Sequence, residues 1–244
     1  MPATDPASAQ DVREAIYVNG TFFQVYGLDG KRTQNGFFAN REDVAGGAGI
    51  EVTDVDRDGK DDVVTAYKGE LVIKFGNGKS MRTRPFGTAY SGEMSFAVGQ
   101  TNRDAPFEIV VTPSQAFQSK VVILNAQGKK LREWLAYRPE FKGGAYVALG
   151  DVDGDGLNEV VTSPGRGGGP HIRIFKTDGA VWAGGFLALD PLETAGARVA
   201  VGDVDGDKRD EIVVGSGPGT LPRFQVYDRG RNLRATFTLG QTMS

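Results

Sequence analysis

The chain has 244 residues, a formal net charge of −3, one histidine and no cysteine. Without cysteine, disulfide frameworks, zinc–thiolate sites and thiol nucleophiles are excluded, and the near-neutral charge without long runs of one sign argues against nucleic acid as a partner. Glycine accounts for 35 residues, about twice its usual share, whereas 39% hydrophobic and 24% charged residues are ordinary for a globular protein, so disorder and collagen are excluded.

The N-terminal segment, residues 1–13, begins with MPATDPASAQ. These residues contain neither a basic start nor an apolar run, and no stretch of the chain approaches the length of a membrane span. We expect no membrane span, and if the protein is exported, its signal is not present in this chain.

An internal repeat organises the rest of the chain. The segment 150–175 reappears at 202–227 without a gap, and further copies give loop starts at Asp54, Gln100, Asp151 and Asp203, which are 46, 51 and 52 residues apart. Residues 14–31 match the part of later copies that follows such a loop, so they open an incomplete copy. Residues 14–244 are expected to form one domain, with repeat units at approximately 14–45, 46–92, 93–142, 143–194 and 195–244.

Each complete unit predicts four short strands. In the unit 143–194 these are residues 145–150, 159–163, 171–175 and 185–189, which are β-branched or aromatic runs bounded by Gly, Pro, Asp and Asn. Residues 129–137 have good helix propensity, but the repeat aligns them with the fourth strand, and we let the repeat decide. Four strands in a unit of about 50 residues are typical of a propeller blade. The sequence thus predicts an all-β fold, a β-propeller of four-stranded blades with about five repeats of 46–52 residues.

The strand count leaves closure of the ring open. Four first strands are counted, against five each of the second, third and fourth strands. Residues 1–13 must therefore supply the missing first strand of a five-bladed ring, or the chain is a fragment of a larger propeller or protein.

Three loops share the pattern D-x-D-x-D followed by a carboxylate at position nine. Their carboxylates are Asp54, Asp56, Asp58 and Asp62; Asp151, Asp153, Asp155 and Glu159; and Asp203, Asp205, Asp207 and Glu211. Four carboxylates within nine residues repel one another unless a cation cancels their charge. Calcium takes six to eight oxygen ligands, including backbone carbonyls, which position seven would supply from Lys60, Leu157 and Arg209.

Other metal sites, and solvated turns without a metal, fit these loops less well. An EF-hand needs a glutamate at position twelve and flanking helices, whereas position twelve is Thr65, Thr162 or Val214 and the flanks are strands. Magnesium prefers a strict octahedron with several retained waters. Solvated Asp-Gly turns explain one such loop, but not three with the same ninth-position carboxylate.

The loops differ in one respect that bears on the number of sites. Lys208 stands where the other loops have Gly59 and Gly156, which leaves calcium binding by the Asp203 loop open. A fourth loop, residues 100–108, has lost part of the acidic pattern and is called the worn loop below. It begins with Gln100 and keeps Asn102, Asp104 and Glu108, but it is not expected to bind calcium. The sequence therefore predicts two to three calcium sites.

These loops and the strands after them resemble the FG-GAP and VCBS repeats, the family of the integrin α-subunit propeller and of many secreted bacterial proteins. The resemblance implies a propeller whose acidic loops join the first and second strands of a blade and hold calcium. It names no ligand, because one fold carries many functions.

Other motifs carry less weight. The glycine-rich segments 165–170 and 215–220 lack the lysine and the following helix of a phosphate loop and are expected to be turns. His171 is expected at a surface or edge, and Trp134 and Trp182 fit the core of a blade better than a glycan site.

The leading hypothesis is a non-enzymatic, calcium-binding module for adhesion, recognition or scaffolding, outside the cell or on its surface, with a protein or glycan ligand. The alternatives are a lectin-like propeller that binds carbohydrate and the accessory propeller of a secreted polysaccharide-degrading enzyme. Catalysis is not expected, because no acid–base pair stands out beyond the metal loops.

Overall fold

The computed structural model describes the backbone of residues 14–19, 22–27 and 37–38, and residues 49–103, 106–204, 209–221 and 223–238. The chain divides into two compact units, Met1–Ala48 and Gly49–Ser244. The described residues contain strands and turns but no helix, so none that could cross a membrane. The all-β prediction is confirmed for this part of the chain.

The first unit contains a three-stranded antiparallel sheet. Its strands, in the order β1-β2-β3, are β1 (Glu14–Asn19), β2 (Phe22–Gly27) and β3 (Phe37–Phe38). The hairpin of β1 and β2 pairs Asn19 with Phe22 at its closed end. Three strands are the number expected for a copy that lacks its first strand. The predicted contribution of residues 1–13 to that missing strand lies outside the described residues.

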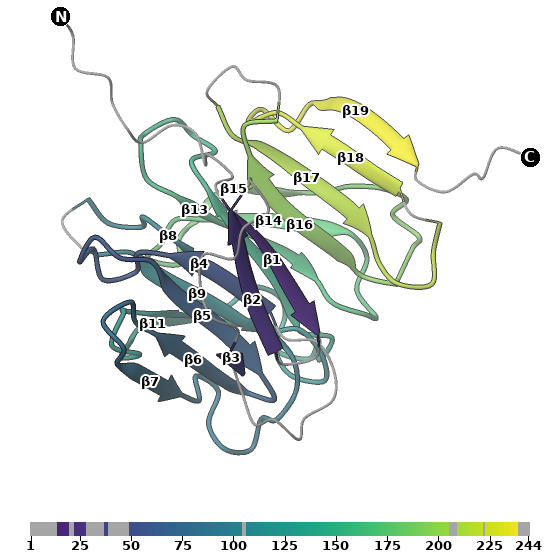
Figure 1. The fold of residues 1–244 in the computed structure, drawn as a ribbon. Coiled ribbons are helices and arrows are strands. Elements are labelled where there is room, and N and C mark those ends of the chain that lie inside the picture. The colour runs from purple at the N-terminus through teal and green to yellow at the C-terminus, as the bar shows by residue number, and fades with distance from the viewer. Residues whose placement is uncertain are drawn as a thin grey trace, which may run out of the picture. The chain divides into compact units, whose positions relative to one another are not determined.

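The second unit contains four antiparallel sheets of four strands each, which Figure 1 shows in chain order. The first sheet consists of β4 (Gly49–Thr53), β5 (Asp62–Tyr67), β6 (Glu70–Lys74) and β7 (Ser80–Thr83). The second consists of β8 (Met94–Gly99), β9 (Glu108–Pro113), β10 (Lys120–Leu124) and β11 (Lys130–Leu135). The third consists of β12 (Ala145–Gly150), β13 (Glu159–Pro164), β14 (His171–Phe175) and β15 (Val181–Leu187). The fourth consists of β16 (Ala197–Gly202), β17 (Glu211–Ser216), β18 (Arg223–Tyr227) and β19 (Leu233–Thr238).

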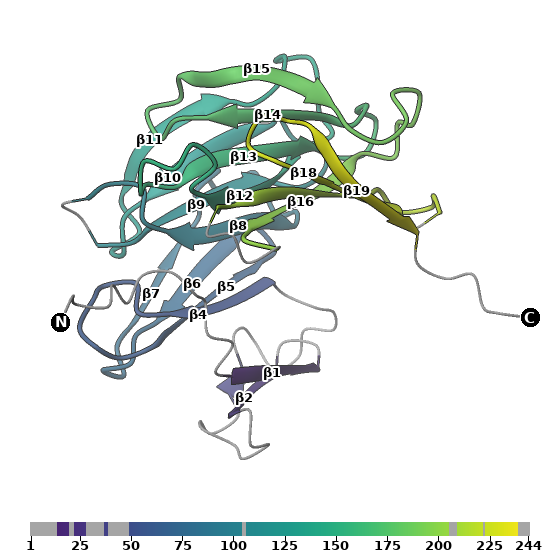
Figure 2. The ribbon, with the colours of Figure 1, turned by 90° about the horizontal axis from the view of Figure 1, so that it is seen from above.

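The first strands of consecutive sheets lie next to one another. Strand β8 contacts both β4 and β12, and β12 also contacts β16; these four strands can be followed in Figure 2. Within each sheet the strands pair in the order in which they occur in the chain. Within the second unit, consecutive sheets therefore pack against one another, which is the relationship predicted for consecutive blades.

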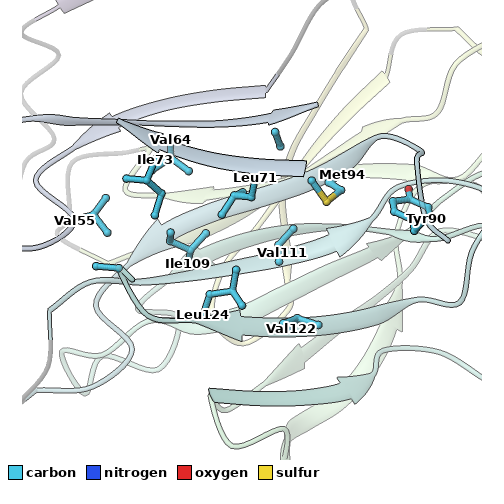
Figure 3. Packing of buried hydrophobic residues seen from close by; sticks show 12 residues of the cluster. Val55, Val64, Leu71, Ile73, Tyr90, Met94, Ile109, Val111, Val122 and Leu124 are labelled. Atoms are coloured by element: carbon cyan, nitrogen blue, oxygen red, sulfur yellow. The ribbon is translucent and has the colours of Figure 1, made fainter. Parts of the chain in front are cut away.

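The core lies between the sheets. Every residue of β9 is buried, and its side chains alternate between two clusters: Ile109 and Val111 face the first sheet, and Val110 faces the third. Figure 3 shows the cluster between the first and second sheets, where Leu71 and Ile73 meet the residues of β9. Because both faces of the second strands are covered, these strands are continuous hydrophobic runs instead of alternating ones.

The strand predictions for the third sheet are mostly confirmed. Strands β12 and β14 have the predicted bounds, and β13 extends one residue beyond its predicted end. The fourth strand was predicted at 185–189 but runs from Val181 to Leu187. Its pairing with β14 shifts register twice, and Leu189 has a φ of 55°, which no strand residue adopts.

The segment with helix propensity is a strand. Strand β11 occupies Lys130–Leu135 and pairs with β10, from Lys120 opposite Leu135 to Leu124 opposite Lys130. Tertiary pairing overrides local propensity here, because a strand at this place completes the second sheet. The repeat was the better guide to this segment.

Candidate metal centres

Each acidic loop joins the first and second strands of a sheet. The residue before the loop and the ninth-position carboxylate form the closing pair of the two strands: Thr53 with Asp62, Gly150 with Glu159 and Gly202 with Glu211. The worn loop is framed in the same way by Gly99 and Glu108. The register of these strand pairs therefore fixes the ninth carboxylate at the base of its loop.

The Asp54 loop is folded around its own carboxylates. Asp54 accepts the N–H groups of Asp58 at 3.0 Å and Gly59 at 2.8 Å. Asp56 accepts the N–H of Asp58 at 3.2 Å, and Asp58 accepts that of Lys60 at 3.0 Å. The alternate aspartates thus point inward and wrap the backbone around a common centre.

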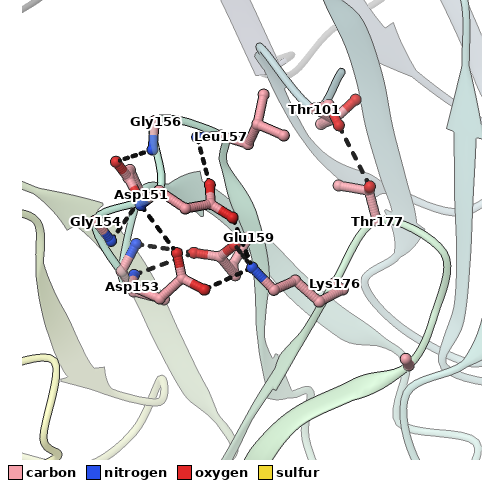
Figure 4. Close-up of polar contacts among 12 residues, drawn as sticks. Thr101, Asp151, Asp153, Gly154, Gly156, Leu157, Glu159, Lys176 and Thr177 are labelled. Atoms are coloured by element: carbon pink, nitrogen blue, oxygen red, sulfur yellow. Dashed lines mark hydrogen bonds and ion pairs between the residues drawn. The ribbon is translucent and has the colours of Figure 1, made fainter. Parts of the chain in front are cut away.

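The Asp151 loop repeats this hydrogen-bond pattern position by position. Asp151 accepts the N–H groups of Asp155 at 3.0 Å and Gly156 at 2.8 Å, and also that of Gly154 at 2.7 Å. Asp153 accepts the N–H of Asp155 at 3.1 Å, and Asp155 accepts that of Leu157 at 2.9 Å. Figure 4 shows the loop and its inward-pointing carboxylates.

Both loops bring three carboxylates together. One oxygen from each of Asp54, Asp56 and Asp58 lies within 4.8 Å of the others, and the same holds for Asp151, Asp153 and Glu159. A calcium ion bound at about 2.3–2.6 Å from each ligand requires oxygens no farther apart than about 5 Å. The all-oxygen donor sets and their spacing therefore fit a hard cation such as calcium.

The ninth carboxylates are buried and hold the start of each loop. Asp62 accepts the N–H groups of Val55 and Gly76, both at 2.9 Å, and Glu159 accepts that of Val152 at 3.0 Å. Neither side chain is exposed to solvent. Burial raises the pKa of both carboxyls above the usual range, although their hydrogen bonds oppose the shift. A nearby cation would therefore stabilise the ionised form of both carboxyls.

Two positions of the loops take a left-handed backbone. Position six is Gly59 or Gly156, with φ of 86° and 83°, and position four is Gly154 or Arg57, with φ of 80° and 60°. Glycine was expected at position six, whereas the left-handed backbone at position four was not predicted from the sequence. Arg57 adopts a conformation that costs energy for a residue with a side chain, and its guanidinium lies 4.9 Å from the ring centroid of Phe107.

Lys176 lies at the Asp151 loop, a position that the acidic motif does not indicate. Its Nζ lies 2.5 Å from Asp153, 2.8 Å from Glu159 and 3.2 Å from Asp155, as Figure 4 shows. Burial lowers the pKa of this ammonium, but hydrogen bonds to the three carboxylates outweigh burial and raise it. Its position follows from strand register. The antiparallel strands β13 and β14 pair Val160 with Phe175, so Glu159, which precedes Val160, lies opposite Lys176, which follows Phe175.

The other two loops are described in part. In the Asp203 loop, Asp205, Asp207 and Lys208 lie outside the described residues, while Glu211 is buried and accepts the N–H of Val204 at 3.1 Å. In the worn loop, Asp104 lies outside them, and buried Glu108 receives a hydrogen bond from the Thr101 hydroxyl and one of 3.3 Å from Arg132. The ninth-position carboxylate thus keeps its place in all four loops.

The sequence match agrees with this geometry. Residues 151–214 match the model of the FG-GAP-like repeat family. This FG-GAP-like segment contains the Asp151 and Asp203 loops, all of β13 and β16, and the start of β17, so the predicted resemblance is confirmed there. No curated protein of related sequence is found.

Solved structures of similar fold extend over most of the chain. The biofilm matrix protein Bap1 of V. cholerae superposes with a TM-score of 0.52 at 17% identity, over 94% of this chain and 34% of Bap1. Rhamnogalacturonan lyase YesW gives 0.53 at 15% identity, over 90% of this chain and 51% of the lyase. An Agrocybe aegerita lectin specific for non-reducing terminal N-acetylglucosamine gives 0.55 at 16% identity, over 95% of this chain and 65% of the lectin. The chain spans less than two thirds of each of these proteins, and the likeness concerns the fold alone.

Proposed function

We propose that the chain is a non-enzymatic, calcium-binding β-propeller module for adhesion, recognition or scaffolding outside the cell or on its surface. The observation that carries the proposal is that the Asp54 and Asp151 loops are folded by the same backbone hydrogen bonds to their first aspartate and each bring three carboxylates within 4.8 Å, at positions one, three and five in the first loop and one, three and nine in the second. The FG-GAP-like match over residues 151–214 supports it.

Calcium would act here as a structural staple. The ligands would be Asp54, Asp56, Asp58 and Asp62 in one loop, and Asp151, Asp153, Asp155 and Glu159 in the other, with backbone carbonyls of Lys60 and Leu157. The bound ion supplies positive charge where the loop concentrates negative charge. The Asp203 loop, with Asp205, Asp207, Arg209 and Glu211, is a third candidate, which gives two to three sites.

Calcium also supports an extracellular location. Extracellular calcium modules bind at roughly 0.1–1 mM, an affinity useful only where calcium is millimolar. Bap1, one of the proteins with a similar fold, is a biofilm matrix protein. At ten times its dissociation constant, each bound calcium adds about 1.4 kcal/mol of stability by mass action.

We propose five blades for the ring. The described residues contain four complete four-stranded sheets and one sheet of three strands at the N-terminal end of the chain. A first strand from residues 1–13 would complete the fifth blade. The competing arrangement is a fragment of a larger propeller, and small-angle scattering separates the closed ring from an open array.

Thermal unfolding with calcium and with a chelator tests the proposed function. We expect calcium in excess to raise the melting temperature by about 3–6 °C per occupied site, since one site contributes about 1.4 kcal/mol. Asp56→Asn and Asp153→Asn should each remove part of this shift, whereas Glu140→Gln, at an exposed position between β11 and β12, should leave it intact. An unchanged melting temperature for the unmodified chain would sink the proposal.

Carbohydrate binding is the second candidate, and a cavity in the fourth and third sheets favours it. The cavity has a volume of about 480 Å³. Its lining includes half-buried Trp182, which also packs against the core of the third and fourth sheets, together with Arg209, Asp228, Asn232, Arg234 and the loop carboxylates Asp153 and Glu211. An aromatic face beside guanidinium, carboxylate and amide groups suits a sugar ring. The lectin of similar fold adds support from its own specificity.

Trp134 does not share this role. Its ring centroid lies 5.8 Å from that of Phe175, and its Nε1 is buried without a hydrogen-bond partner among the described residues. Trp134 therefore packs in the core between the second and third sheets, the role that the sequence analysis favoured over a glycan site. A glycan array tests the cavity: binding should be lost in Trp182→Ala and kept in Leu192→Ala, which removes an exposed side chain outside the cavity. Equal binding by both variants would rule the cavity out.

A further inference from the structure

Lys176 places a positive charge inside an acidic loop that is also a candidate calcium site. Its Nζ contacts Asp153 at 2.5 Å and Glu159 at 2.8 Å, which are two of the three carboxylates that the Asp151 loop brings together. Glu159 is fully buried, and the Lys176 side chain is 35% exposed. An ammonium group at these distances occupies part of the space that a metal ion shared by the same oxygens would need.

The equivalent residue of the first sheet carries no charge. Phe75 donates its N–H to Lys79 at 2.9 Å and accepts that of Gly78 at 2.9 Å, and Lys176 makes the same two turn hydrogen bonds with Ala180 at 2.8 Å and Gly179 at 2.9 Å. Strand register agrees, because β5 and β6 pair Val63 with Lys74, which brings Phe75 beside Asp62 as Lys176 lies beside Glu159.

The carboxylates of the Asp54 loop consequently have no paired protein cation in the described part of the chain, although Arg57 and Lys60 belong to the loop itself. No ion pair there involves Asp54, Asp56, Asp58 or Asp62. Within the described residues, the aspartates of this loop are hydrogen-bonded only by backbone N–H groups. The two loops therefore have the same backbone pattern and different charge compensation.

In the worn loop, a side-chain cation also lies beside the ninth-position carboxylate. The first position of this loop is Gln100, and buried Glu108 is met by the guanidinium of Arg132 at 3.3 Å and by the hydroxyl of Thr101. A side-chain cation thus accompanies the ninth carboxylate where the acidic pattern has been lost. The Asp151 loop combines the complete acidic pattern with an internal cation.

We infer that Lys176 is a built-in cation that keeps the Asp151 loop closed without metal and lowers its affinity for calcium, while the Asp54 loop depends on calcium for its closure. The inference rests on the proposed calcium-binding function. For calcium to reach Asp153 and Glu159 together, the ammonium must give up at least two ion pairs. That cost lowers calcium affinity at the Asp151 loop and is absent at the Asp54 loop.

Hydrogen exchange measured by mass spectrometry tests this on the full chain, because it reads each loop separately. Peptides covering residues 54–62 and 151–159 are compared in chelator and over a calcium titration. In the unmodified chain, calcium should slow exchange in both peptides. The calcium concentration at the midpoint should be at least about tenfold lower for 54–62 than for 151–159, a ratio that corresponds to about 1.4 kcal/mol.

Substitutions of Lys176 provide the decisive comparison. Lys176→Met should speed exchange of 151–159 in chelator and bring its calcium midpoint close to that of 54–62. Lys176→Arg, which keeps the charge, should retain most of the protection in chelator. Lys129→Met removes an exposed lysine in the corresponding turn of the second sheet and should change neither loop.

The reverse substitution keeps the test informative if Lys176→Met fails to fold. Phe75→Lys introduces the lysine beside the Asp54 loop, and the long side chain can cover part of the same apolar surface. It should raise the calcium midpoint of 54–62 without affecting 151–159.

The outcomes separate the inference from the function on which it rests. Equal calcium midpoints for the two loops in the unmodified chain, or unchanged midpoints in Lys176→Met, would overturn the inference while calcium binding stands. Absence of any calcium effect on either loop, in the unmodified chain and in Lys176→Met, would overturn the proposed function itself.

Discussion

Asp210 accepts the backbone N–H of Asp151 at 2.8 Å and so connects two consecutive acidic loops. Asp210 occupies position eight of the Asp203 loop, and Asp151 occupies position one of the loop before it. The preceding pair of loops is linked at the same positions through the backbone, where the N–H of Asn158 donates to the carbonyl of Gln100 at 2.8 Å. Position eight, which the sequence pattern leaves unassigned, thus joins each of these loops to its neighbour.

Removing this link should destabilise the chain. Asp210→Ala leaves the N–H of Asp151 without its acceptor, and we expect a loss of about 1–2 kcal/mol in the free energy of unfolding, measured by urea denaturation. Asp210→Asn retains an oxygen acceptor and serves as the matched control, with a loss of less than about 0.5 kcal/mol. Full stability of Asp210→Ala would show that the two loops are not coupled through this contact.

The left-handed glycines of the Asp151 loop should resist substitution for a reason of backbone conformation alone. Gly156 has a φ of 83°, and the nearest atoms to an added Cβ lie at 3.7 Å, so space is not limiting. We expect Gly156→Ala to lower the free energy of unfolding by about 1 kcal/mol in chelator. Gly184→Ala is the control, since Gly184 has no positive φ and no atom within 4 Å. Equal stabilities for the two variants would contradict this account of the loop.

Glu51 should make stability depend on pH. This carboxylate on β4 accepts the N–H of Val98 on β8 at 3.0 Å, and burial raises its pKa from 4.5 to about 7. The folded state therefore holds a proton that the unfolded state releases between about pH 4.5 and 7. The contribution to stability is complete below pH 4.5 and is lost as pH rises through 7, by up to about 3 kcal/mol.

Glu51→Gln should remove this part of the pH dependence. Urea denaturation of the two proteins in chelator, from pH 4.5 to 8, should show the variant gaining stability relative to the unmodified chain as pH rises. Glu140→Gln, at an exposed position, provides the control for loss of one carboxyl. Parallel pH profiles for Glu51→Gln and the unmodified chain would show that Glu51 ionises normally.

Much of the fold could be predicted from the sequence because the repeat supplies information that single segments lack. Strands β12 and β14 were predicted with their bounds, and residues 130–135 were recognised as a strand against their helix propensity. Strand β15 was misplaced because its register shifts are set by pairing with β14, and hydrophobic pattern does not encode them.

The candidate site was predictable in its ligands but not in its surroundings. Carboxylate spacing located both loops that gather three acidic side chains. The role of Lys176 depends on the pairing of β13 with β14, which brings together residues 17 positions apart. Asp210 acts across two sheets, and the strain at Arg57 becomes visible only in the backbone angles. Register and dihedral angles decide these features, and neither is written in the acidic motif.

The number of calcium ions bound per chain tests the central claim most directly. Equilibrium dialysis at millimolar calcium, with metal and protein quantified in the same sample, should give two to three ions for the unmodified chain. A variant with Asp54→Asn, Asp56→Asn and Asp58→Asn should bind one fewer, and the same exchange at Asp151, Asp153 and Asp155 should also remove one. Zero bound calcium in the unmodified, folded chain would contradict the account.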